Sequence, residues 1–122
     1  MKAIKITTDD LAIVVDIKDL KDMQKHVGGY IETTRSFGLN NLDVTDNFSL
    51  LMIVNEEGKN QKLPYNEVAT DALCNWDDIA GDVLIMQEGF VDGEPDIVGL
   101  SDEQVKDLMD IFENDYDMKV ME

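Results

Sequence analysis

The side chains used most often for nucleophilic and zinc chemistry are scarce in this sequence. It holds one cysteine, Cys74, and one histidine, His26. These two could act as nucleophile and base only if the fold brought their side chains within hydrogen-bonding distance. Cys74 follows an apolar stretch and is typical of a core position, whereas His26 is expected at a helix end, where it would complement the helix dipole.

The count of these residues also limits metal sites and compartment. One cysteine cannot form an internal disulfide, and two residues cannot complete a four-ligand zinc site. We therefore predict no catalytic residues, no enzyme activity, no metal site and no cofactor. The same cysteine usage predicts a reducing compartment, the cytoplasm.

Carboxylates are abundant, but their spacing does not match a known metal loop. Asp43, Asp46 and Asn47 lack the spacing and the glycine of a calcium loop, and residues 92–96 form a short, turn-like stretch. We interpret both groups as solvated turn carboxylates.

The negative charge is strongly segregated along the chain. The net charge is −17. Residues 1–65 hold ten acidic and eight basic side chains, whereas residues 66–122 hold 17 acidic side chains and only Lys106 and Lys119 as cations. The negative electrostatic potential of the second half repels nucleic acid and anionic membranes and attracts a basic protein surface. We expect a protein partner, and neither direct nucleic-acid binding nor membrane binding.

Two interpretations of the acidic half stay open. One is a solvated surface that maintains solubility. The other is a carboxylate array that imitates the phosphates of a nucleic acid and occupies the basic groove of a nuclease. Segregation favours the second, because solubility does not require it.

The clearest acidic array is predicted on a helix at residues 101–118. Ser101 and Gln104 form a capping-box pattern at its start. Apolar residues recur on one face at helical spacing. The predicted partner-binding residues are the carboxylates of the other face: Asp102, Glu103, Asp107, Asp110, Glu113, Asp115 and Asp117.

The near-neutral half suggests a different site. Gly28 and Gly29 end a predicted helix and therefore do not form a phosphate loop before a helix N-terminus. A pocket for a small nucleotide beside Tyr30 and Arg35 is the alternative hypothesis. Under it the protein would bind or sequester a signalling nucleotide.

The pattern of elements predicts a single α+β domain over residues 1–122. Strands and short helices follow one another without regular βαβ alternation, which favours a small mixed or antiparallel sheet. Residues 36–47 are rich in Asn, Asp and Gly and predict a loop, and Gly89, Gly93 and Pro95 predict another, with a small hairpin ending at Val98. Strands are predicted at 2–6, 11–17, 30–34, 48–54, 61–63 and 82–87. Helices are predicted at 18–27, at 66–73 with Asn66 as its cap, and at 101–118.

Four segments, taken in order, resemble a known family. They are residues 27–32 (VGGYIE), 54–59 (VNEEGK), 63–70 (LPYNEVAT) and 79–85 (IAGDVLI). Together they resemble the family catalogued as domain of unknown function 3846, over residues 1–87, so that the helix after Ser101 lies outside the matched part. The resemblance implies an accessory protein of phages, plasmids or other mobile elements of gut bacteria, and supplies no catalytic residues.

The first nine residues and the acidic tail are also similar, less closely, to small anti-CRISPR proteins that block Cas9. These resemblances imply a bacterial host cell. The leading hypothesis is therefore a non-enzymatic inhibitor that binds Cas9 or another nucleic-acid-handling defence protein through its acidic half. A regulatory partner protein without a role in defence is a further alternative, and the oligomeric state stays open.

Overall fold

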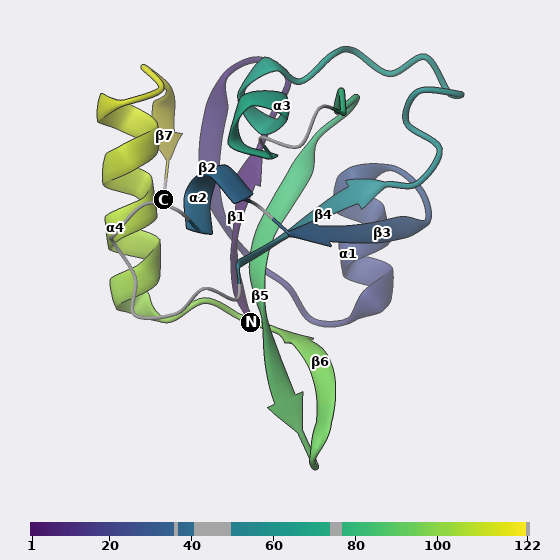
Figure 1. Ribbon diagram of the computed structural model, residues 1–122, viewed down its shortest axis with the longest axis vertical. Coiled ribbons are helices and arrows are strands. Elements are labelled where there is room, and N and C mark those ends of the chain that lie inside the picture. The colour runs from purple at the N-terminus through teal and green to yellow at the C-terminus, as the bar shows by residue number, and fades with distance from the viewer. Residues whose placement is uncertain (36, 41–49, 74–76, 122) are drawn as a thin grey trace.

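The computed structural model describes residues 1–35, 37–40, 50–73 and 77–121 of the chain. Cys74 and residues 43–47, considered above, lie outside these ranges. The described residues form seven strands and four helices (Figure 1). The strands are β1 (Lys2–Ile6), β2 (Leu11–Asp16), β3 (Ile31–Arg35), β4 (Leu50–Asn55), β5 (Val83–Val91), β6 (Glu94–Val98) and β7 (Lys119–Met121). The helices are α1 (Leu20–Val27), α2 (Phe37–Asn40), α3 (Glu67–Leu73) and α4 (Asp102–Asn114).

All seven strands belong to one sheet in the order β3-β4-β5-β1-β2-β7, with β6 paired to the outer part of β5. Every pairing is antiparallel except that of β2 with β7, which is parallel. The predicted α+β class and mixed sheet are confirmed. Strand β5, from the acidic half of the chain, lies between β1 and β4 from the neutral half, so the two halves interleave in space.

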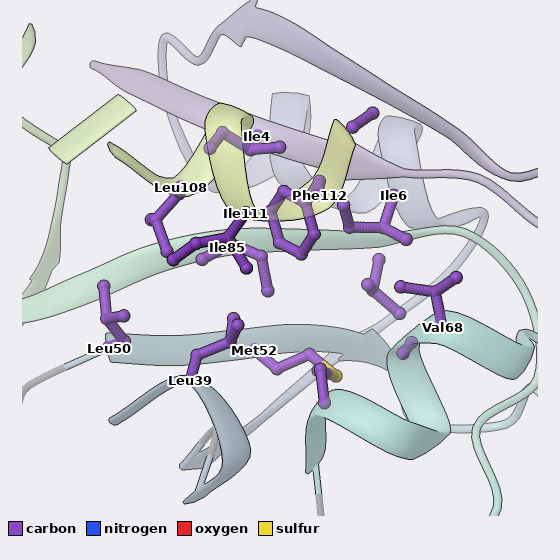
Figure 2. Packing of buried hydrophobic residues seen from close by; sticks show 14 of the residues in the cluster. Ile4, Ile6, Leu39, Leu50, Met52, Val68, Ile85, Leu108, Ile111 and Phe112 are labelled. Atoms are coloured by element: carbon purple, nitrogen blue, oxygen red, sulfur yellow. The ribbon is translucent and has the colours of Figure 1, made fainter. Parts of the chain in front are cut away.

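Helices cover both faces of the sheet. On one face, α2, α3 and α4 pack on the larger core, in which Phe112 of α4 contacts apolar side chains of β1 and β5 (Figure 2). On the other face, α1 is the one helix of the described ranges, and it places Met23 and Val27 over buried residues of β4 and β5. These two layers fix α4 and α1 on opposite sides of the molecule (Figure 1).

The predicted glycine end of α1 and the predicted capping-box start of α4 are confirmed. The Asp19 carboxylate accepts the first-turn N–H of Asp22, and Gly28 ends α1 with a left-handed φ of 86°. At α4 the capping box between Ser101 and Gln104 is complete. The Gln104 amide also pairs with the Gln87 amide at 3.0 Å, which ties the start of α4 to β5.

Asn66 joins three segments through one buried side chain. Its amide nitrogen donates to the carbonyl oxygens of Ile6 at 3.1 Å and Gly81 at 2.9 Å. Its amide oxygen accepts the N–H of Ala69 at 3.0 Å and thereby caps α3, as the sequence predicts. One side chain therefore holds the end of β1, the entry to β5 and the start of α3 together.

Several elements differ from the sequence prediction. The predicted loop at residues 36–47 contains α2, where Leu39 is fully buried. Residues 61–63 form no strand: residues 61 and 62 lie in turns, and Lys62 has a left-handed φ of 56°, which an extended strand does not allow. Helix α4 ends at Asn114 instead of continuing to residue 118, and the unpredicted strand β7 follows it.

Two glycines that suggested loops serve close packing instead. A Cβ atom at Gly38 would lie 2.5 Å from the Ala72 carbonyl oxygen, so glycine lets α2 approach α3. A Cβ atom at Gly89 would lie 2.7 Å from a methyl group of Val98, so glycine lets β5 continue to Val91 against β6. Glycine therefore marks tight contact at both positions.

We predict that Asn66→Ala lowers the free energy of unfolding by about 2–4 kcal/mol, because it removes a helix cap and leaves buried carbonyl groups without a donor. Urea denaturation at neutral pH measures this loss. Asn60→Ala is the matched control, since Asn60 is exposed and its amide nitrogen donates to the Glu57 carboxylate at the surface. An equal loss in both variants would contradict the role given to Asn66.

Candidate functional site

Five carboxylates from three separate parts of the chain line one hollow of about 560 Å³. We call it the acidic hollow and define it by Asp10, Glu67, Asp71, Asp115 and Asp117. The sheet topology brings them together, because the turn between β1 and β2 lies beside the connection from α4 to β7. A backbone hydrogen bond of 3.1 Å from Lys119 N to Asp10 O joins these two segments.

The walls of the acidic hollow include two tyrosines. Tyr65 is half exposed, and Tyr116 packs its ring against Phe112 with centroids 5.9 Å apart. Val68 and Thr70 of α3 complete the lining. The site is therefore a shallow bowl with aromatic walls and a carboxylate rim.

No carboxylate of the acidic hollow forms an ion pair with a residue that the structure describes. The lysine and arginine ion pairs of the described residues lie elsewhere and each joins a cation of the neutral half to a carboxylate of the acidic half. They are Lys2–Asp102, Lys5–Asp82, Arg35–Glu88 and Lys59–Asp77. These ion pairs therefore neutralise four carboxylates of the second half of the chain, and none of the four belongs to the acidic hollow.

The outer side of α4 carries part of the predicted array. Asp110 and Glu113 are exposed and Asp107 is half-buried. Lys106 lies on the same side and interrupts the row, which the sequence prediction did not weigh. Glu103 is exposed in the first turn of the helix.

The two ends of the predicted row of carboxylates differ from the sequence prediction. Asp102 forms an ion pair with Lys2, and this hydrogen bond lowers the pKa of the Asp102 carboxyl. Asp115 caps the C-terminus of α4 and Asp117 lies beyond it with a φ of 52°, so neither continues the helical row. Both belong to the acidic hollow instead.

The sequence prediction missed Asp10, Glu67 and Asp71. They lie far from the terminal helix in the chain, and Asp10 belongs to the half with little net charge. No spacing rule links them, because their proximity depends on the order of the strands. Only the correct order of the strands would have shown that these three carboxylates lie near the end of α4.

The residues of the nucleotide hypothesis lie apart. Tyr30 precedes β3 and Arg35 ends it, so about 16 Å of extended strand separates them. Arg35 pairs with Glu88 at 3.0 Å. A hollow of about 340 Å³ beside β3 holds Lys59 but also four carboxylates, those of Glu32, Glu56, Asp77 and Asp78, which do not suit a phosphate.

His26 lies in the last turn of α1, as predicted. Burial, with the nearby Lys5 and Lys25 ammonium groups, lowers its pKa from the usual 6.5, against the opposing effect of Asp22. The imidazole is therefore mainly neutral at pH 7, and so does not supply the positive charge that was expected to complement the helix dipole.

Within the described ranges, no group of three or more His, Cys, Asp or Glu side chains has an arrangement that could hold a metal ion. Likewise, none of the described helices is long and apolar enough to cross a membrane.

Comparisons with known proteins give one match. A sequence profile of the family described as domain of unknown function 3846 matches residues 1–113. The match continues beyond residue 87, where the resemblance was expected to end, and includes nearly all of α4. Neither the curated proteins nor the solved structures contain a match to this chain.

We predict that the double variant Asp115→Asn, Asp117→Asn is more stable than the wild type at low salt, by about 0.5–1 kcal/mol. A carboxylate at a helix C-terminus opposes the dipole, and asparagine accepts the left-handed conformation of position 117. Urea denaturation at about 0.05 M and about 1 M NaCl measures the effect, which salt should suppress. A gain that is equal at both salt concentrations would contradict the electrostatic cause.

We also predict that His26→Gln reduces the loss of stability between about pH 7.5 and about pH 5.5. Because the folded pKa of His26 lies below its unfolded value, the unfolded state binds more protons below pH 6.5, and acidification destabilises the wild type through this group. Chemical denaturation of both proteins at the two pH values checks this. An unchanged pH dependence would show that His26 contributes nothing.

Proposed function

The chain belongs to the domain of unknown function 3846 family, and from that premise we propose that it is a non-enzymatic binding protein. Its acidic hollow and the outer side of α4 would dock on the basic, nucleic-acid-binding surface of a defence protein. Cas9 is the first candidate, and another nuclease is the second. Phage or mobile-element origin and anti-CRISPR activity are part of this proposal.

One observation carries the proposal: five carboxylates line one hollow at the C-terminal end of α4, and none of them forms an ion pair with a cation of the described residues. Mutual repulsion and the negative end of the helix dipole both oppose this arrangement. A role in solubility alone does not require carboxylates to gather where they lower stability. Cations of a partner would remove both penalties at once.

The size of the surface suits a groove that holds nucleic acid. Helix α4 has 13 residues and so extends for about 20 Å. Carboxylates three or four residues apart on its outer side lie about 5 Å apart along the axis, on the scale of phosphate spacing along one strand. The acidic hollow adds further carboxylates at the C-terminal end of the helix, outside this row.

The mechanism would be competition for the same cations. Lysine and arginine side chains that bind phosphates would pair with Asp71, Asp110, Asp115 and their neighbours, which excludes nucleic acid from the groove. Such contacts speed association and weaken as salt screens them. Tyr65 and Tyr116, at the wall of the acidic hollow, add apolar area and can stack on a guanidinium group.

We predict that the wild-type protein binds Cas9 at about 0.05 M NaCl, inhibits its cleavage of DNA, and loses at least tenfold in affinity at about 0.5 M NaCl. The triple variant Asp10→Asn, Asp71→Asn, Asp115→Asn should lose at least tenfold in affinity at low salt. Surface plasmon resonance gives the affinities, and a DNA cleavage assay gives the inhibition.

The matched control is the triple variant Glu32→Gln, Glu56→Gln, Asp78→Asn. It removes the same number of charges from the hollow beside β3. Equal losses in both variants would mean that only net charge matters, and binding that ignores salt and both variants would overturn the acidic docking surface. Restriction nucleases are tested in the same way as the second candidate partner.

A further inference from the structure

Exposed apolar side chains lie on and beside the β5–β6 hairpin, with Phe90 and Val91 at the end of β5 next to the turn. Among the described residues seven large hydrophobic side chains are exposed, and four of them lie in this region: Met1 at 43%, Leu20 at 53%, Phe90 at 74% and Val91 at 47%. The hairpin projects beyond the rest of the molecule, and the N-terminus lies at its base (Figure 1). Clustered exposed apolar residues of this kind usually mark an interaction site.

Three of these side chains, those of Met1, Leu20 and Val91, line a groove of about 400 Å³ between the start of α1 and the hairpin, and Phe90 lies outside this lining. We call it the hairpin groove. Its lining residues are Met1, Asp19, Leu20, Met23, Val91, Asp96, Ile97 and Val98. Phe90 lies on the same face of the hairpin as Ile97, because Ile97 pairs with Glu88, two residues before Phe90.

The framework of the groove is held in place. The N-terminal ammonium group donates to the Asp16 carboxylate at 3.0 Å and to the Ile17 carbonyl oxygen at 2.9 Å, which fixes Met1. Met23 and Ile97 belong to the core beneath the groove. The exposed side chains therefore stand on a rigid base, which is favourable for anchoring a partner.

The charges at the groove indicate what binds there. Its lining contains two carboxylates, Asp19 and Asp96, and no lysine, arginine or histidine among the described residues, while the N-terminal ammonium group of Met1 pairs with Asp16. The hairpin turn adds Asp92 and Glu94, both exposed. A second copy of this chain is a poor occupant, since pairing along β6 would bring these carboxylates together and Pro95 lacks an N–H to donate.

We infer that the hairpin groove binds a segment of a protein partner that carries apolar side chains flanked by lysine or arginine. Leu20 and Phe90 would anchor the apolar side chains, and the carboxylates would pair with the flanking cations at the rim. An apolar centre with a charged rim is the usual arrangement of a specific protein interface. The inference does not rest on the acidic hollow.

Three synthetic helical peptides test the inference by fluorescence anisotropy. One has leucine on one face and lysine elsewhere, the second replaces lysine by glutamate, and the third replaces leucine by serine. Measurements at about 0.15 M NaCl on the variant Asp10→Asn, Asp71→Asn, Asp115→Asn weaken binding at the acidic hollow while the carboxylates at the rim of the groove stay only partly screened. We expect the leucine–lysine peptide to bind best, and Leu20→Ser with Phe90→Ser added to weaken it about thirtyfold.

Tyr30→Ser is the matched control, because Tyr30 is 72% exposed and lies away from the groove. Amide chemical shifts of the otherwise unsubstituted chain should change around Leu20, Val91 and Ile97 when the leucine–lysine peptide is added, which supports the inference even if the double variant folds poorly. Equal binding of the serine–lysine or the leucine–glutamate peptide would overturn it. So would a dimer in sedimentation analysis that Phe90→Ser dissociates, since the occupant would then be a second copy.

Discussion

Strand β5 is the constraint on which the rest of the structure depends. It pairs with β1 through Val83 to Ile85 and with β4 through Leu84 to Gln87, so it closes the sheet between the two halves of the chain. The buried Asn66 amide holds the entry to β5 against the end of β1. The Gln87–Gln104 amide pair then fixes α4 relative to β5. The positions of the acidic hollow and the hairpin groove both depend on β5, because this strand determines where α4 begins and where the hairpin leaves the sheet.

The sequence predicted local structure well where local chemistry decides it. Alternating apolar residues marked β1, β-branched residues marked β2, and the caps at Asn66 and Ser101 marked two helices. The elements that were missed depend on tertiary contact: α2 is stabilised by burial of Leu39, and β7 by pairing with β2. Gly38 and Gly89 misled the prediction, because glycine permits close packing as readily as it permits a turn.

The charge pattern was predictable only in part. Counting residues located the excess in the second half, but the fold decides which carboxylates stay without a cation. Lys5 and Arg35 of the first half reach carboxylates of the second half across the sheet, whereas Asp10 of the first half joins Asp115 and Asp117. The sequence therefore predicts the net negative charge of each half, whereas the order of the strands is needed to predict which carboxylates share one surface.

The acidic hollow and the hairpin groove lie at opposite ends of β1, since Met1 lines the groove and the turn after β1 carries Asp10. Five strand residues span about 17 Å, so no single short segment can occupy both. Their physics also differs: carboxylates speed encounter with a basic partner and respond to salt, whereas apolar contacts mainly slow dissociation. A large basic partner that used both would bind quickly through the acidic hollow and be retained through the hairpin groove. Two separate partners would instead give two salt responses, and this difference distinguishes one composite interface from two independent ones.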